Sequence, residues 1–380
     1  MSISLDTYKA GEYRKGYRYS YFLPSMINAD WQWTSPVINQ LLEKAAVRLG
    51  ELNAFSRLVP DIDLFIRLHV TNEAVLSSRI EGTQTNMDEA LLPEAEIDPE
   101  RRNDWKEVNN YILALNQAIE ELETLPVSSR LLQQTHATLM DSVRGEHKAP
   151  GDFRSTQNWI GGASLADAAF IPPAQEHVAE LMGDLEKFLN NDDLEIPALI
   201  RIAIAHYQFE TIHPFLDGNG RIGRLLITLY LVAVGVLDNP LLYLSAFFEK
   251  NKSLYYDNLT AVRTRNDMEQ WLKYFLVGVE STAAQASSTL GKILQLKLST
   301  EKTIANSFGR RAPTAYLLLN HLFREPIIRV DDAAKVLRIS YRTANSLVTL
   351  FQQHNILKET TGQSRNRMFV FGPYLRIFDE

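Results

Sequence analysis

The chain has 380 residues and a formal net charge of −7 at pH 7, with 45% hydrophobic and 22% charged residues. This composition is typical of an ordinary globular protein, and the length suggests two or three domains. The sequence contains no cysteine, which excludes disulfides and thiolate metal sites and fits a cytoplasmic location. The longest apolar run, Leu225 to Leu237, has 13 residues and is too short to span a membrane.

Charge is distributed unevenly along the chain. Residues 311–380 contain ten Lys or Arg residues against six Asp or Glu residues, a net of +4. Since the whole chain carries −7, residues 1–310 carry −11. A basic tail on an acidic body indicates that only the tail is suited to meet nucleic acid.

Helices dominate the predicted structure. Ser35 and Pro36 read as an N-cap and a first helical residue. A second helix is expected to start at Pro60-Asp61 and to end near Glu81-Gly82, because glycine suits the position after a helix C-terminus. Further helices are expected at residues 103–123, 127–141, 174–190, 196–210, 221–236 and 253–280.

Two stretches break this pattern. Residues 157–173 contain two short apolar runs around Gly161-Gly162, which predicts a hairpin. Residues 281–311 predict a connecting helix and linker. After Pro313, helical patterns at residues 314–324, 331–338 and 341–353 precede a strand, a basic turn and a second strand. Three helices and a β-wing predict a winged helix-turn-helix.

The segment from His213 to Arg224 reads HPFLDGNGRIGR and joins two apolar helices. Gly218 and Gly220 allow positive φ, so that successive main-chain N–H groups can converge on one point. That point lies at the N-terminus of the following helix, whose dipole favours an anion. The sequence therefore predicts an anion site in this loop.

The charged residues of the segment suit phosphate chemistry. Arg221 and Arg224 lie three residues apart on the first helical turn and supply two guanidinium forks for phosphate oxygens. Asp217 is a hard oxygen ligand suited to Mg²⁺. His213 has an ordinary pKa of about 6.5, so its ring can accept a proton at neutral pH.

This segment resembles the signature HPFx(D/E)GNGRxxR of the Fic family of protein adenylyltransferases, and every specified position matches. The resemblance implies transfer of AMP from Mg-ATP to a Tyr, Thr or Ser hydroxyl of a protein. His213 would be the general base and Asp217 would hold Mg²⁺. The anion hole would comprise Gly218, Asn219 and Gly220, while Arg221 and Arg224 would meet the β- and γ-phosphates.

Three neighbouring features fit the same resemblance. The hairpin at residues 157–171 resembles the Fic flap, which pairs with a target segment through its main chain; the alternative is a plain surface hairpin. Asn251 occupies a place where related sequences use asparagine near adenine, or it begins a solvated helix. Gln208 lies just over one turn before His213 and either lines the nucleotide pocket or is a partly exposed helical residue.

The segment Ser77 to Gly82 matches the family's inhibitory pattern (S/T)xxxE(G/N) at the end of the second predicted helix. Glu81 would then compete with the γ-phosphate for Arg224. At about 4 Å and an effective dielectric near 20, such a contact is worth roughly 4 kcal/mol before desolvation. The alternative is an ordinary glutamate at a helix C-terminus.

The predicted fold is mainly α: a Fic helical bundle with a small flap hairpin and a C-terminal winged helix-turn-helix. The predicted domains are an N-terminal region with the inhibitory helix (1–100), the catalytic core (101–280), a connector (281–312) and the winged helix (313–380). Two other functions stay open, namely a DNA-binding regulator with a sensing Fic body, and an enzyme that also removes AMP. Family habit adds self-modification and a homodimer.

The tail offers a candidate DNA surface with few positive charges. Ser340, Tyr341, Arg342, Thr343 and Asn345 lie near the N-terminus of the predicted recognition helix, the end that usually enters the major groove. The proposed wing carries Gln363, Arg365 and Arg367, suited to phosphates. Because the net charge is modest, binding of DNA, docking of a protein and structural capping all remain open.

Overall fold

The computed structural model describes residues 2–59, 62–141, 148–362 and 367–378. The fold is mainly α, as predicted. The larger helices of the body are α1 (Pro36–Leu58), α2 (Asp63–Ile80), α4 (Arg102–Glu121), α5 (Ser129–Leu139), α6 (Gln175–Asn190), α7 (Ala198–Ile212), α8 (Asn219–Ala233), α10 (Lys252–Arg265) and α11 (Met268–Ser307). Two short helices, α3 (Met87–Ala90) and α9 (Ser245–Lys250), complete the body.

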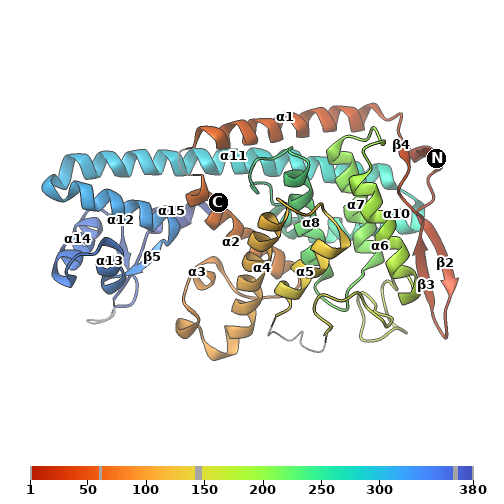
Figure 1. Cartoon of the computed structure of the whole chain (residues 1–380), viewed down its shortest axis with the longest axis horizontal. Helices are drawn as coiled ribbons and strands as arrows, with labels where there is room; N and C mark the ends of the chain where they lie inside the picture. The colour runs from red at the N-terminus through yellow and green to blue at the C-terminus, as the bar shows by residue number, and fades with distance from the viewer. Residues whose placement is uncertain (1, 60–61, 142–147, 363–366, 379–380) are drawn as a thin grey trace.

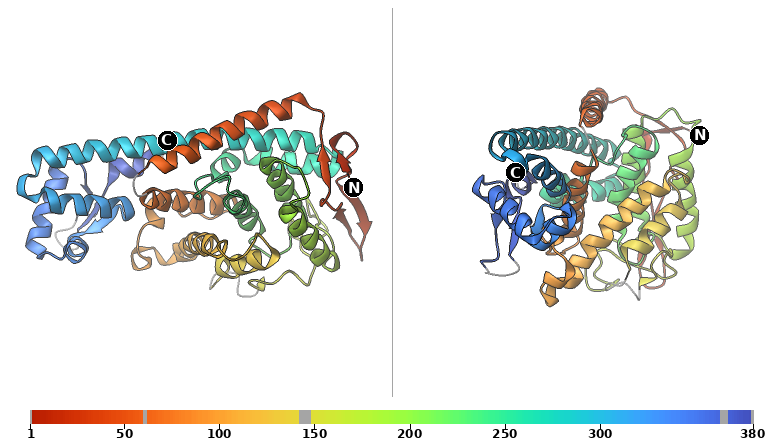
Figure 2. Two further views of the ribbon diagram at one scale, coloured as in Figure 1. Left: turned by 45° about the horizontal axis from the view of Figure 1, so that its top comes forward. Right: turned by 60° about the vertical axis from the view of Figure 1, so that its left-hand side comes forward.

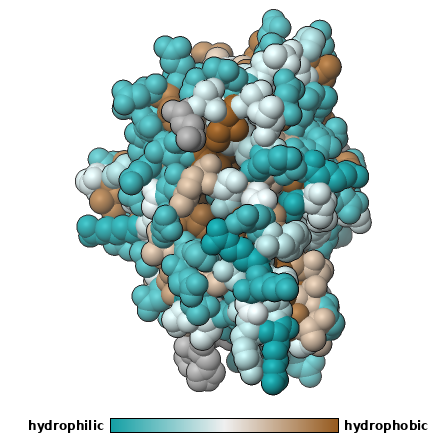
Figure 3. All heavy atoms as spheres, turned by 90° about the vertical axis from the view of Figure 1, so that its right-hand side faces the viewer, coloured by the Kyte–Doolittle hydropathy of each residue, from teal (hydrophilic) through white to brown (hydrophobic). Residues whose placement is uncertain are grey.

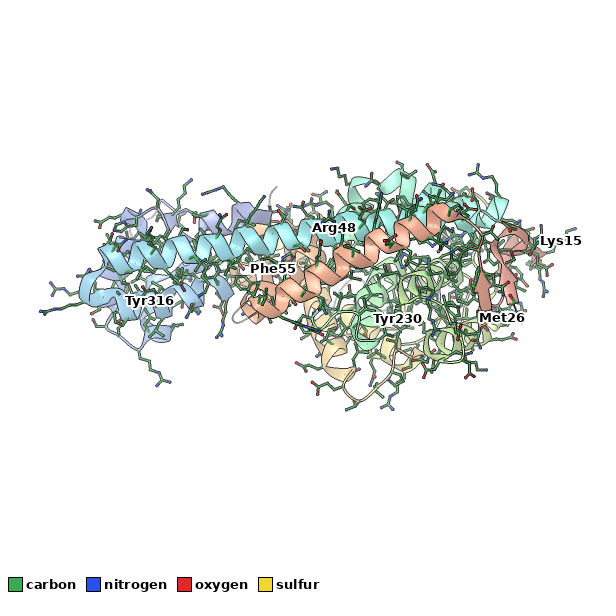
Figure 4. The ribbon with its side chains drawn as sticks, turned by 90° about the horizontal axis from the view of Figure 1, so that it is seen from above. Lys15, Met26, Arg48, Phe55, Tyr230 and Tyr316 are labelled. Carbon is green, nitrogen blue, oxygen red and sulfur yellow. The ribbon has the colours of Figure 1, made fainter. Side chains whose placement is uncertain are left out.

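The longest helix, α11, runs along one side of the molecule with α1 beside it (Figure 1). Figure 4 shows the pair from above, with Phe55 on the side of α1 that faces α11. A Cβ on Gly291 of α11 would lie 3.9 Å from the Phe55 ring, so the helices pack closely there. Its 40 residues rise by about 1.5 Å each, and the helix continues without a break from the body to the C-terminal domain.

The core is centred on α7, in which every residue from Leu199 to Ile212 is buried. A helix that is buried on all sides must be covered on all sides, and α6, α8 and α11 pack against α7. The indole N–H of Trp271 donates to the Ala203 carbonyl at 2.8 Å and so ties α11 to α7. The loop between α7 and α8 therefore joins two largely buried helices.

Short strands form the N-terminal segment that precedes α1. The sequence predicted no helix in this segment. The strands are β1 (Ser2–Ser4), β2 (Gly11–Lys15), β3 (Ser20–Pro24) and β4 (Asp30–Gln32). The first pairs in parallel with β4, and β2 pairs antiparallel with β3. The surface at this end is mostly hydrophilic, with scattered apolar patches (Figure 3).

The C-terminal domain contains α12 (Ala312–Arg324), α13 (Val330–Leu337) and α14 (Tyr341–Gln353), and a short α15 (Gly372–Leu375) follows. Its antiparallel sheet has the order β5 (Ile327–Arg329), β7 (Met368–Val370), β6 (Lys358–Glu359). Three helices and a three-stranded sheet therefore follow α11, and the winged helix-turn-helix stays a prediction. The sequence reading missed β5, which is only three residues long.

The C-terminal domain also contacts α2. The rings of Phe65 and Phe323 are 6.0 Å apart, and Arg67 pairs with Glu325 at 3.7 Å. A groove of about 890 Å³ lies beside this contact, between α2 and α4 of the body and β5 of the domain. Figure 2 shows the domain at one end of the long helix, against the body.

Several local predictions need correction. The helix expected at residues 253–280 is interrupted, because Asn266 adopts φ 60° and ends α10 before α11 begins. Ser35 occupies the N-cap position of α1, but its hydroxyl makes no capping bond there. The expected start of the second helix at Pro60-Asp61 lies outside the described residues.

Among the described residues, no helix combines the length and apolar character that crossing a membrane requires.

We predict that Trp271→Ala lowers the free energy of unfolding by about 3–5 kcal/mol, because it removes a fully buried indole and leaves a cavity. Urea unfolding followed by circular dichroism measures the change. Leu298→Ala on the same helix is the control, since this side chain is 58% exposed and its loss should change stability by at most about 0.5 kcal/mol. Equal losses in both variants would contradict the central role of α7 and α11.

Candidate active site

The loop between α7 and α8 begins with a strained residue. His213 ends α7 with φ 51° and ψ 61°, in the left-handed region. A non-glycine residue there costs roughly 1–2 kcal/mol, so the surroundings must hold it. Its N–H bonds to the Phe209 carbonyl at 2.9 Å, and Pro214 follows, which cannot continue a helix. The main chain thereby fixes the point at the end of α7 from which the imidazole extends.

Side-chain bonds close the rest of the loop. Asn219 bridges both main-chain groups of Phe215, accepting from its N–H and donating to its carbonyl, each at 2.8 Å. His136 of α5 lies against the Phe215 ring, with centroids 3.8 Å apart and planes 7° from parallel. Its Nε2 donates to the Asp217 carbonyl at 3.0 Å, and its Nδ1 accepts from the Gly151 N–H. The Asn219 side chain therefore braces the loop.

The first turn of α8 presents main-chain donors. Gly218 is the N-cap residue with φ 74°, and as a glycine it offers no side chain to cap the N–H groups that follow. Such uncapped groups favour an anion. The expectation that Gly220 also has positive φ is wrong, because this residue lies inside the first turn of α8. Its lack of a side chain has another reason: a Cβ there would lie 2.3 Å from Oε1 of Glu81.

The guanidinium of Arg224 is held by the end of α2. Its Nε donates to the Ser77 hydroxyl at 2.8 Å, and Nη2 donates to the Ser77 carbonyl at 2.9 Å and to Glu81 Oε1 at 2.7 Å. The Arg224 side chain is 1% exposed and that of Glu81 is 35% exposed. The structure thus brings together the two residues that the sequence reading paired, 143 positions apart.

Electrostatics at this contact favour both charges. Burial raises the pKa of the Glu81 carboxyl, but Arg224 together with Arg221 and His213 outweighs burial, and the net pKa lies below its usual value. Burial lowers the pKa of Arg224, and Glu81 together with Tyr255 and Glu210 more than reverses that effect. The end of α2 is also capped, because Lys252 Nζ donates to the Ile80 carbonyl at 2.5 Å. Glu81 therefore stays ionised and fixed beside the α8 N-terminus.

Arg221 has a partner of its own. Its Nη1 lies 3.2 Å from Glu107 Oε2 of α4, and both side chains are largely buried. Asp217 differs from its neighbours because it is exposed, with Oδ1 accepting from the Gly218 N–H at 2.7 Å. No group of three or more metal-binding side chains exists among the described residues. One exposed carboxylate beside an anion site nevertheless fits Mg²⁺, which commonly takes one or two carboxylates plus substrate phosphates.

The imidazole of His213 is neutral at physiological pH. Burial lowers its pKa to about 4, with Arg263 and Arg154 adding to the effect, while Glu81 opposes it. Its Nδ1 is buried and has no hydrogen-bond partner within the described chain. A neutral ring with a vacant nitrogen is suited to accept a proton.

The outer candidates behave differently. Gln208 is fully buried and donates to the Ser25 carbonyl at 2.9 Å, so its described hydrogen bond faces the N-terminal strands rather than the signature loop. Its burial contradicts the interpretation of a partly exposed helical residue, while the role in the nucleotide pocket stays a prediction. Asn251 links α9 to α10 and donates to the Phe247 carbonyl at 2.8 Å, immediately before the lysine that caps α2. Through Lys252 it is connected to the end of α2, and its place near adenine stays a prediction.

The predicted flap hairpin is reduced to one antiparallel bridge, between Ile160 and Phe170. Beyond it the chain forms an irregular tip, in which Asp167 accepts from the N–H groups of Ala163 and Ser164. A hydrogen bond from the Ser164 hydroxyl, together with these two main-chain bonds, lowers the pKa of Asp167 to about 2. Gly161 and Gly162 both have positive φ, which breaks strand geometry close to the bridge. On its other edge the flap pairs with β3, where the Phe22 N–H donates to the Ile171 carbonyl at 3.0 Å.

The C-terminal surface uses several of its candidate residues internally. Ser340 caps α14 by accepting from the Thr343 N–H at 3.2 Å. Asn345 accepts from Arg367 at 2.8 Å, which ties the helix to the wing. Tyr341 and Arg342 remain exposed. Gln363 and Arg365 lie outside the described residues.

Sequence reasoning missed the residues that hold the loop from outside. Arg154 and Asn158 bond to the His213 carbonyl, and His136 bonds to the Asp217 carbonyl. No spacing rule signals these contacts, since they join segments 55 to 81 positions apart. The only available sign was the occurrence of Arg154 and Asn158 at the border of the predicted flap.

Comparison with known proteins agrees with this geometry. Residues 39–120 match the family described as Fic/DOC family N-terminal, and residues 126–231 match the Fic/DOC family itself. The chain belongs to the Fic/DOC family. A crystal structure of a Fic family protein from Desulfovibrio desulfuricans shares the fold, with a TM-score of 0.56 and 20% identity over 89% of this chain and 96% of that one.

The named Fic relatives are longer proteins, and this chain matches only part of each. Protein adenylyltransferase Fic of Drosophila grimshawi is 25% identical over 297 residues, covering 72% of this chain and 56% of the relative. Protein adenylyltransferase fic-1 of Caenorhabditis briggsae is 30% identical over 137 residues, covering 33% of this chain and 25% of the relative. This chain therefore spans little more than half of the first relative and a quarter of the second.

We predict that the His213 ring stays neutral down to about pH 5, because burial lowers its pKa to about 4. Ring chemical shifts recorded by NMR between pH 4 and pH 8 measure the titration, and the His213→Ala spectrum assigns the signal. A midpoint near 6.5, the value of an ordinary histidine, would contradict the buried environment described above.

Proposed function

We propose that this chain transfers AMP from Mg-ATP to a hydroxyl group of a protein, and that Glu81 inhibits the transfer. The observation that carries the proposal is the arrangement around α8. An uncapped helix N-terminus and two buried arginines adjoin a neutral histidine with a vacant Nδ1. The names of the relatives, protein adenylyltransferases, support the same reaction.

Each residue has a role in this proposal. His213 accepts the proton of the acceptor hydroxyl, whose oxygen then attacks the α-phosphorus while pyrophosphate leaves. The N–H groups of the α8 first turn and Arg221 hold the phosphates. Asp217 would hold Mg²⁺, which would neutralise phosphate charge. The flap would align the target segment by main-chain pairing.

Inhibition follows from competition for one guanidinium. Arg224 donates three hydrogen bonds to Ser77 and Glu81 and is almost fully buried. A γ-phosphate needs the same donors, so the carboxylate and the phosphate cannot occupy that position together. Nucleotide bound while Glu81 is in place would have its phosphates displaced from the transfer geometry.

Two further activities belong to the proposal as alternatives. An enzyme that also removes AMP would use Glu81 to orient a hydrolytic water, and loss of AMP from a modified protein, assayed apart from transfer, tests that role. A DNA-binding regulator would instead need salt-sensitive binding of duplex DNA by the full chain.

We further propose self-modification, a homodimer and a cytoplasmic location, the last from the absence of cysteine.

His213→Ala should abolish AMP transfer while ATP binding remains. Loss of a general base typically costs about 10²–10⁴-fold, whereas phosphate binding rests on the α8 turn and the arginines. Labelling with α-labelled ATP and Mg²⁺ in lysate, followed by mass spectrometry of labelled peptides, measures transfer and identifies the acceptor. Undiminished labelling would remove His213 from the mechanism.

Glu81→Gly should raise AMP transfer, including self-modification, because it frees Arg224 for the γ-phosphate. Labelling is compared with the native sequence at matched Mg-ATP. Adding Arg224→Ala to the same chain should cancel the gain, since this arginine is the group that is released. The inhibitory role of Glu81 is wrong if the single variant labels no better than the native chain.

A further inference from the structure

Arg154 is a buried cation whose hydrogen bonds all go to main-chain carbonyls. Its side chain is 3% exposed. The Nε donates to His213 at 2.9 Å, Nη1 to Thr156 at 3.2 Å, and Nη2 to Pro173 at 2.5 Å and Ile212 at 3.3 Å. Burial lowers its pKa to about 10, and no carboxylate pairs with it within the described chain.

These carbonyls belong to two different parts of the molecule. Thr156 and Pro173 lie at the two ends of the flap, and Ile212 and His213 end α7. The main-chain N–H of Arg154 adds a bond to the Pro214 carbonyl at 2.8 Å. Asn158 reinforces the junction from inside the flap, because its Nδ2 donates to the carbonyls of His213 and Phe215.

A buried charge without a counter-ion is costly, so its retention needs a reason. Only the planar, five-donor fork of arginine reaches several fixed carbonyls at once; lysine offers one nitrogen and a point charge. The fork meets the carbonyl of the residue that has left-handed geometry, and both ends of the flap. It therefore fixes the position of the flap relative to the His213 backbone.

We propose that Arg154 is a positioning residue for adenylyl transfer, which holds the flap and the ring of His213 at a fixed separation. The inference rests on the proposed function, since the flap would carry the acceptor hydroxyl that this ring deprotonates. A misplacement of about 1 Å between reacting groups can reduce a rate by about 10²-fold. Arg154 touches neither reacting group and acts through the two segments that it joins.

The charge of Arg154 can be separated from its geometry. Four groups act on the His213 ring: Arg263 of α10 and Arg154 lower its pKa, while Glu81 of α2 and the Glu210 carbonyl of α7 raise it. Arg154→Lys keeps the charge and loses the fork, whereas Arg154→Met loses both. Removing the cation raises the pKa of His213, so the acid limb of activity should move to higher pH in the methionine variant alone.

Arg201 provides a matched control at the other end of α7. It is 7% exposed, and its guanidinium also donates to main-chain carbonyls, those of Leu189, Asn191 and Leu194. Arg201→Lys therefore removes a similar buried fork far along the helix from the signature loop. It separates a general loss of stability from a loss of position at the site.

The experiment places both lysine variants and Arg154→Met in full-length chains that also carry Glu81→Gly. We expect Arg154→Lys to lower kcat about 10²-fold with unchanged ATP affinity, and Arg201→Lys to retain kcat. Asn158→Ala, which removes the neighbouring bonds, should lower kcat in the same direction. Equal kcat in the parent and Arg154→Lys would overturn the proposal, as would an equal loss in Arg201→Lys.

Hydrogen exchange supplies a readout that does not depend on transfer. The N–H groups of Ile160 and Phe170 form the flap bridge, and they should exchange faster in Arg154→Lys but not in Arg201→Lys. If the Glu81→Gly parent labels nothing, the proposed function fails and exchange alone decides. Unchanged protection of both amides in Arg154→Lys would then reject the positioning role.

Discussion

The contact between Arg224 and the end of α2 is the interaction on which the rest of the site depends. A guanidinium that is 1% exposed would be costly to bury without Ser77 and Glu81. Gly220 has no side chain in a place where a Cβ would collide with the carboxylate. The main chain of the first α8 turn thus leaves room for the Glu81 carboxylate beside it.

The loop between α7 and α8 must hold the strained residue His213 without using its imidazole ring. His213 is fixed through its main chain, by Arg154 and Asn158 at its carbonyl and by the Phe209 carbonyl at its N–H. None of these bonds uses the imidazole. Burial keeps the ring neutral, and its Nδ1 has no hydrogen-bond partner within the described chain. The bonds that fix His213 therefore leave this ring nitrogen unused.

Sequence reasoning reached the helices and the signature loop because both leave local patterns: helical periodicity, and a glycine-rich segment with charges at fixed spacing. The pairing of Glu81 with Arg224 followed from a motif. Positions that depend on long-range contacts were not accessible, so the Asn219 bridge and the burial of Gln208 came only from the structure. The break at Asn266 rests on one residue in the left-handed region, which no flanking glycine or proline announces.

One helix, α2, belongs to two packing environments, and this has a thermodynamic consequence. Its first turns pack against Phe323 of the C-terminal domain, and its last residues hold Arg224. About 24 Å of continuous helix separates Phe65 from Glu81. The two contacts therefore share one rigid element, and a displacement of α2 as a whole would cost the free energy of both the ring contact with Phe323 and the hydrogen bonds to Arg224.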